Sequence, residues 1–281
     1  MKKNIRFLKL LFSRKIVVAA VAVILFFLLC AIASPIMATH DPNEQDLANR
    51  FQGISTAHWL GTDQFGRDLY SRIVYGARIA FLVGIFSVFV GAALGCLIGL
   101  VSGYFGGWVD SLLMRLMEAQ MSIPALILAL ALVAVLGKSV PMLIFLLGIS
   151  SVPNFARMMR GQVMTIRETD YVSASRIRGN SDLFTMFRHV LPNCISPIII
   201  VMTQSIGGSI LAEAGLSFLG AGIVPPTPSW GSMVNAGYQN MQQSLLGTIA
   251  PGMAIILLVL AFNILGDALR DALDPRIRNR Q

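Results

Sequence analysis

Charged side chains are scarce in this sequence of 281 residues. Only 13% of the residues are charged, whereas 55% are hydrophobic, and the mean hydropathy is +0.70. Soluble domains carry roughly a quarter charged residues. A chain of this composition has more apolar surface than one water-soluble core can bury, so the sequence predicts an integral membrane protein.

Residues that bind metals or do covalent chemistry are also few. The three cysteines lie in or beside apolar stretches and are odd in number, which favours buried small side chains over disulfides. His40, His58 and His189 are far apart in the sequence, without metal-ligand spacing and with no acid grouped with them. We therefore expect no metal site, no catalytic residues and no cofactor bound by this chain.

The apolar stretches contain almost no ionisable groups, although ion-coupled transporters usually need such groups within their spans. Glu213 is the one acid close to a predicted span, and its position favours a hydrogen-bonded structural role over a proton relay. The tripeptide Gly137-Lys138-Ser139 resembles the end of a phosphate-binding loop, but Leu132 stands where that motif needs its first glycine. The energy for any transport would then come from another protein.

Six stretches are long and apolar enough to cross a membrane, which takes about twenty residues. They are residues 16–36, 79–102, 123–136 (extended back toward 119), 140–156, 194–211 and 246–266. The first also resembles a secretory signal, but it is longer than a signal core and five more spans follow. Residues 216–244 are uncharged but rich in Gly, Pro and Ser, which predicts a structured external segment.

Basic residues predict the orientation. In the six-span model, seventeen of the 22 Lys and Arg residues lie on one side and five on the other, which places both termini in the cytoplasm. Their spread between apolar runs argues against nucleic-acid binding, despite a net charge of +8. The predicted organisation is a basic N-terminus (1–15), a first span (16–36), an external segment (37–77), a five-helix core (78–267) with a cytoplasmic loop (157–192), and a cytoplasmic tail (268–281).

Glycines recur within the second predicted span. Gly91, Gly95 and Gly99 are spaced by four, and Gly84 lies on the same helix face. Small residues at this spacing let a second helix approach closely. We expect this face to pack against another helix and to bind no ligand.

The loop at 157–192 is basic and is patterned as two short helices. Thr169 or Asp170 can cap the first, which ends at Gly179, and Ser181 or Asp182 can cap the second. A loop of this kind could simply lie on the membrane surface. A helix-Gly-helix elbow projecting into the cytoplasm is the more specific prediction.

The detail of the elbow resembles the EAA signature of ABC importer permeases. Ser173-Ala174-Ser175, then Gly179, then Val190-Leu191-Pro192-Asn193 follow its order, although Ser173 and Ser175 replace the acidic residue and the second alanine. In that family the elbow inserts into a groove of the ATPase subunit. The resemblance implies an ATPase-coupling role for seven residues: Ser173, Ala174, Ser175, Arg176, Gly179, Leu191 and Pro192.

Three further stretches resemble the dipeptide, oligopeptide and nickel permeases. Two are residues 216–231 and 263–276. The third is an external motif that comprises Gly61, Thr62, Asp63, Gly66, Arg67, Asp68, Ser71 and Arg72. Its charged residues can pair with one another or with a binding protein, and internal pairing is favoured. Trp230 is expected to be an interfacial anchor of the segment at 216–244, in preference to a ligand contact.

The resemblance implies a fold for this chain and a transporter made of several subunits. The fold would be all-α, with the six transmembrane helices of a type I ABC importer permease in the cell's inner membrane. This chain would be the C-type permease, paired with a second homologous permease, two ATP-binding subunits that use ATP and Mg²⁺, and an external substrate-binding protein. The expected cargo is short peptides. Nickel or another chelated metal is the alternative cargo, and an ion-coupled carrier is the alternative class of transporter.

Overall fold

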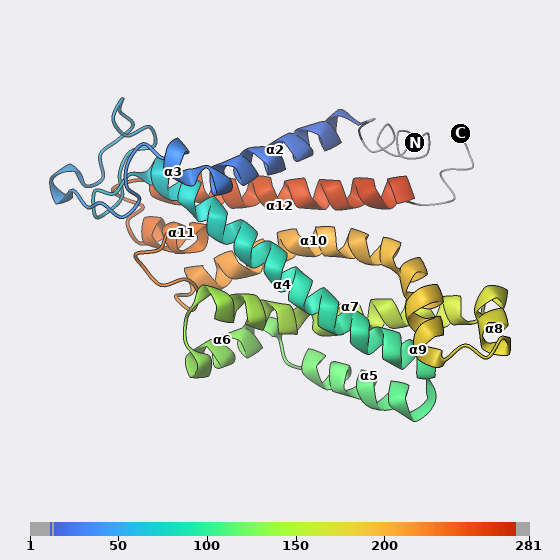
Figure 1. Ribbon diagram of the computed structural model, residues 1–281. Helices are drawn as coiled ribbons and strands as arrows, with labels where there is room; N and C mark the ends of the chain where they lie inside the picture. Colours follow the sequence, from blue (N-terminus) through green and yellow to red (C-terminus); the bar gives the residue numbers. More distant parts are fainter. Residues whose placement is uncertain (1–11, 13, 274–281) are drawn as a thin grey trace.

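The computed structural model describes residue 12 and residues 14–273, and these residues are helical with no β-strand among them. Long helices run along the bundle, and shorter helices connect them or lie near its ends (Figure 1). The elements are α2 (Lys15–Ile32), α3 (Ser34–Met37), η1 (Leu47–Asn49), α4 (Leu69–Phe105), α5 (Gly107–Met121), α6 (Ala125–Leu136), α7 (Val140–Arg167), α8 (Asp170–Ile177), α9 (Asp182–Thr185), the π-helix η2 (Met186–Val190), α10 (Leu191–Phe218), α11 (Trp230–Gln239) and α12 (Leu246–Leu273).

Five helical segments in the described part of the chain are long and apolar enough to cross a membrane, and a sixth crossing is possible through a bent pair. They correspond to five of the six predicted spans. The third predicted span is not one straight helix, because α5 and α6 meet at an angle of 83°. Pro124 lies at this break and supplies no backbone N–H to continue α5. The 12 residues of α6 reach only about 18 Å, short of the roughly 30 Å of a hydrocarbon core.

Several helices run further than the sequence predicted. α4 begins at Leu69, so the end of the predicted external segment at 37–77 is already helical. α7 continues to Arg167, so the predicted loop at 157–192 starts as an extension of the fourth span. Charge marked the limits of the predicted spans, but a helix continues past the membrane wherever its backbone hydrogen bonds and tertiary contacts persist. Residues 274–281 of the predicted tail lie outside the described residues.

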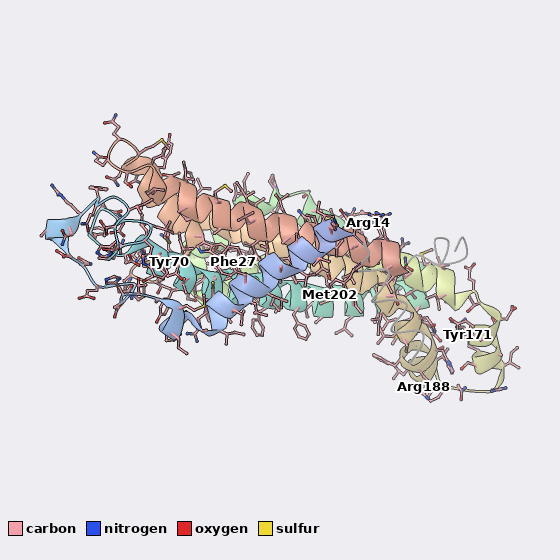
Figure 2. All side chains as sticks on the ribbon, turned by 90° about the horizontal axis from the view of Figure 1, so that it is seen from above. Arg14, Phe27, Tyr70, Tyr171, Arg188 and Met202 are labelled. Carbon is pink, nitrogen blue, oxygen red and sulfur yellow. The ribbon has the colours of Figure 1, made fainter. Side chains whose placement is uncertain are left out.

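The two loop systems lie at opposite ends of the helix bundle. α8 and α9 are at one end, and the irregular residues 38–68 and α11 are at the other (Figure 1). Figure 2 shows Tyr171 and Arg188 at the end opposite Tyr70. At one end of the bundle Arg14 and Asp271 form an ion pair of 3.1 Å that joins the start of α2 to the end of α12. This arrangement agrees with termini that share one side of the membrane.

The glycine face of α4 packs against α7, as the spacing predicts. A Cβ atom added at Gly95 would lie 2.6 Å from both Phe155 Cβ and the Val152 carbonyl oxygen. One added at Gly99 would lie 2.8 Å from Met159 Cβ. Gly84, on the same helix, instead faces Ile210 of α10. Small residues on α4 therefore let its backbone approach that of α7 closely.

Candidate functional site

The elbow, residues 168–190, is built from local helix signals. α8 follows Thr169, whose hydroxyl donates to the Ile166 carbonyl at 2.6 Å instead of capping α8. α8 ends before Gly179, which has φ +78°, a conformation that costs most other residues about 1–2 kcal/mol. Ser181 then caps α9 by accepting a hydrogen bond from the Phe184 amide at 3.3 Å. The helix-Gly-helix prediction is confirmed.

The elbow is fastened to the bundle by its inner face. Val172 is fully buried in a cluster that includes Leu100 of α4 and Met186 of η2. The hydroxyls of Ser175 and Thr185 lie 3.0 Å apart in a buried contact that joins α8 to α9. These contacts make the two short helices one unit with a fixed shape.

Tyr104, near the end of α4, also holds the elbow, although the sequence did not single it out. Its hydroxyl donates to Asp182 Oδ1 at 2.8 Å. The Arg176 guanidinium lies over its ring, 4.8 Å from the centroid. Tyr104 therefore connects α4 to both α8 and the start of α9. No sequence signal links residues so far apart.

The seven residues of the ATPase-coupling prediction do not all face the same way. Ser175 is buried and Leu191 is partly buried, so both serve the inner packing of the elbow and α10. The other five are exposed: Ser173, Ala174, Arg176, Gly179 and Pro192. The outer side also carries large apolar residues that the prediction did not include. We call these four the elbow patch: Ile177 (87% exposed), Leu183 (62%), Phe184 (48%) and Phe187 (48%).

The elbow is continuous with two long helices. It follows α7 directly, and the chain is helical from Asp182 to Phe218 through α9, η2 and α10. Arg160 of α7 forms two hydrogen bonds of 2.6 Å with Asp110 of α5, and Asp110 also accepts from Ser102 of α4. A force on the elbow would therefore reach α4, α5, α7 and α10 together.

We keep the name external segment for the irregular residues 38–68, which lie within the segment predicted at 37–77. They contain six of the eight residues of the predicted external motif. Asp63 accepts hydrogen bonds from Arg67 Nε at 2.7 Å and from the backbone amides of Phe65 and Arg67 at 2.8 and 3.0 Å. Arg72 lies 3.8 Å from the same carboxylate and donates to the Pro42 carbonyl at 2.7 Å. All three charged side chains are buried. The favoured internal pairing is confirmed for Asp63, Arg67 and Arg72.

The other motif residues shape the turn of this segment. The Thr62 hydroxyl donates to the Asn49 carbonyl at 2.6 Å and accepts from the Gln52 amide at 2.8 Å. Gly61 and Gly66 have φ +78° and +73°, and a Cβ at either would overlap a backbone carbonyl. These glycines therefore let one loop of the external segment cross another.

Asp68 and Ser71 form the cap of α4. The Asp68 carboxylate accepts from the Ser71 amide and hydroxyl at 2.8 and 2.7 Å, and from His58 Nδ1 at 2.9 Å. Burial raises the pKa of Asp68, but the hydrogen bonds from Ser71 and His58 outweigh it, so the pKa lies below its ordinary value of 3.8. Asp68 is therefore ionised at neutral pH.

The expectation that the histidines are scattered is wrong for two of the three. His40 and His58 stack with ring centroids 4.6 Å apart, and both approach Asp68. The residues come together because the chain returns from the end of α3 to the start of α4. Sequence spacing could not show this, since the loop between them has no regular period.

Trp230 is a buried packing residue and not an interfacial anchor. Only 1% of it is exposed, and its indole Nε1 donates to the Ile73 carbonyl of α4 at 2.9 Å. Its ring makes an edge contact with Phe27 of α2, and a Cβ at Gly76 would lie 2.6 Å from it. Trp230 therefore does fix α11, but it does so through the helix core.

Replacing Trp230 by Phe should reduce the free energy of unfolding by about 1–2 kcal/mol, because the hydrogen bond between the buried indole and the Ile73 carbonyl is lost and the smaller ring packs less completely. Thermal unfolding of the detergent-solubilised protein measures the change. Trp108→Phe is the matched control, since Trp108 is 76% exposed and should leave stability unchanged. Equal unfolding temperatures for the two variants would contradict the assigned role.

Glu213 has the hydrogen-bonded structural position that its sequence context favours. It is 2% exposed, and its Oε1 accepts from the Ser217 hydroxyl at 2.6 Å. The Ser217 hydroxyl in turn accepts from the Ile223 amide at 3.1 Å. This chain of bonds secures the residues that follow α10. Lys138 lies at the same end and donates to the Gly220 carbonyl at 2.7 Å.

Comparison with known families agrees with this architecture. Residues 95–279 match the model of the binding-protein-dependent transport system inner membrane component family. The chain belongs to this family. Residues 5–53 also match the N-terminal transmembrane domain of oligopeptide transport permease C. The chain is thus an inner membrane component with several membrane-spanning helices, and its N-terminal part resembles that of an oligopeptide permease.

Relatives of this inner membrane component include peptide permeases. It is 40% identical to the dipeptide transport system permease protein DppC of Alkalihalophilus pseudofirmus, over 96% of this chain and 89% of that protein. It is 41% identical to the glutathione transport system permease protein GsiD of Pectobacterium atrosepticum, over 94% of this chain and 87% of that protein.

Solved structures share the fold. A chain of the MetNI methionine ABC transporter in an inward-facing conformation matches with a TM-score of 0.59 and 18% identity, over 72% of this chain and 97% of that one. A chain of an amino acid ABC transporter matches with a TM-score of 0.56 and 16% identity, over 73% and 95%. The architecture is therefore that of ABC importer permeases.

Proposed function

We propose that this chain is the C-type permease subunit of an ATP-binding cassette importer for short peptides. The elbow carries the proposal. Its inner face is packed and hydrogen-bonded, its outer side carries the exposed apolar elbow patch, and it is continuous with the two long helices α7 and α10. An ATPase that moved the elbow would move those helices with it. The relatives that transport dipeptide and glutathione support the peptide cargo.

The complete transporter would contain several chains. A second, homologous permease would pair with this one, two ATP-binding subunits would use ATP and Mg²⁺, and an external binding protein would deliver the peptide. This chain would have no catalytic role of its own. The external segment is already internally paired through its charged residues, so it would offer the binding protein a preformed surface.

The cargo is tested by uptake into cells that lack the gene for this chain, with and without the gene restored. We expect restoration to recover uptake of a radiolabelled dipeptide and to leave uptake of radiolabelled nickel unchanged. Recovery of nickel uptake alone would assign the metal cargo instead. Transport by the purified chain in vesicles, driven by an ion gradient with no ATPase present, would overturn the importer proposal.

A further inference from the structure

Three possible metal ligands converge in the external segment from separate parts of the chain. His40 follows α3, His58 lies in the loop, and Asp68 caps α4. One ligand atom from each lies within 4.8 Å of the others. Asp68 Oδ1 is 2.9 Å from His58 Nδ1 and 3.9 Å from His40 Nδ1.

We propose that His40, His58 and Asp68 bind a divalent transition-metal ion of the zinc class. Two imidazole nitrogens and one carboxylate oxygen are the donor set that Zn²⁺ accepts, with a water in the fourth position. Donors at 2.0–2.1 Å from a tetrahedral ion lie about 3.3 Å from one another. The two distances between Asp68 Oδ1 and the histidines lie on either side of this value, so small side-chain rotations create the site.

The Asp68 carboxylate is oriented for this role by its second oxygen. Oδ2 accepts hydrogen bonds from the Ser71 amide at 2.8 Å, the Ser71 hydroxyl at 2.7 Å and the Thr39 hydroxyl at 3.2 Å. Oδ1 is left facing the two histidines. Fixed partners of this kind reduce the loss of freedom when a ligand binds its metal and are typical of built metal sites.

The site is open to solution on one side. The side chains of His40 and His58 are 34% and 15% exposed, whereas that of Asp68 is 1% exposed. An ion can therefore enter past His40 and meet a buried carboxylate. Once bound, it would link the residues after α3 to the first turn of α4, and so hold the external segment against the bundle. It would be a resident ion and not a cargo.

Metal binding by the full-length chain in detergent tests the proposal. The protein carries an affinity tag without histidine, is stripped with a chelator, and is then equilibrated with Zn²⁺ before metal analysis. We expect one ion for each chain, and a Co²⁺ form with the intense visible absorption of a tetrahedral site. His40→Ala and His58→Ala should each weaken binding by more than about tenfold.

The remaining histidine supplies the control. His189 lies in the elbow, far from the cluster, so His189→Ala should bind Zn²⁺ as the wild type does. His40→Ala decides the outcome if His58→Ala fails to fold, because His40 is the more exposed residue and its loss leaves the His58 bond to Asp68 intact. Binding that is absent from the wild type, or equal in wild type and His40→Ala, would overturn the proposal.

Discussion

Replacing Ile177 by glutamate should abolish copurification of an ATP-binding subunit with this chain and, with it, ATP-driven uptake. Ile177 is the most exposed member of the elbow patch, at 87%. A group of large apolar side chains exposed together, as in the elbow patch, is typical of a docking surface. A charge at the centre of such a contact must be desolvated without a partner, which weakens binding by at least about thirtyfold for a central residue.

The exposure of Ile177 also keeps this experiment interpretable. A substitution on an exposed surface changes folding stability by about 0.5 kcal/mol or less. Failure of the ATP-binding subunit to copurify would therefore show that docking is lost and not that the chain has unfolded. Ile54→Glu is the matched control, because Ile54 is 68% exposed but lies in the external segment at the other end of the bundle. Pull-down from solubilised membranes, followed by an ATPase assay, measures both. Undiminished ATPase recovery with Ile177→Glu would refute the assigned docking surface.

Gly179 is a less decisive position for the same test. No atom lies within 4 Å of a Cβ built on it, so a side chain there meets no steric barrier within this chain. The cost is the strain of φ +78°, about 1–2 kcal/mol. Loss of function after a substitution at Gly179 could therefore come from a distorted elbow or from a blocked surface, and the experiment would not separate the two causes. Ile177→Glu changes the surface alone.

The second large effect is expected inside the membrane. Gly99→Ala should lower the free energy of unfolding by about 3 kcal/mol, the upper end of the range for overpacking. A Cβ at Gly99 would overlap the Ala156 carbonyl oxygen and lie 2.9 Å from the Arg160 amide nitrogen. Both are backbone atoms of α7, so no side-chain rotation relieves the clash, and α4 and α7 must move apart.

Gly161→Ala on the same α7 is the control for this prediction. No atom lies within 4 Å of a Cβ built there, and alanine in a helix is more stable than glycine by about 0.5–1 kcal/mol. The unfolding temperature of the detergent-solubilised protein should therefore fall for Gly99→Ala and should not fall for Gly161→Ala. A similar response of the two variants would show that the α4–α7 crossing does not limit stability.

Local patterns in the sequence determined the membrane class and the helical elements. Apolar runs located five of the spans because a membrane helix must satisfy its backbone internally and present apolar side chains to lipid. The spacing of Gly91, Gly95 and Gly99 predicted a close crossing, since one helix face is fixed by the period of 3.6 residues. Gly179 and Ser181 predicted the elbow, because the signals that stop and start a helix are local.

The tertiary structure decided what the patterns left open. It buried Trp230 against α4 and used Tyr104 to hold the elbow. These outcomes depend on contacts between residues far apart in the chain, which no local period encodes. The grouping of His40, His58 and Asp68 has the same cause: an irregular loop brings distant residues together only once both of its ends are held by packed helices.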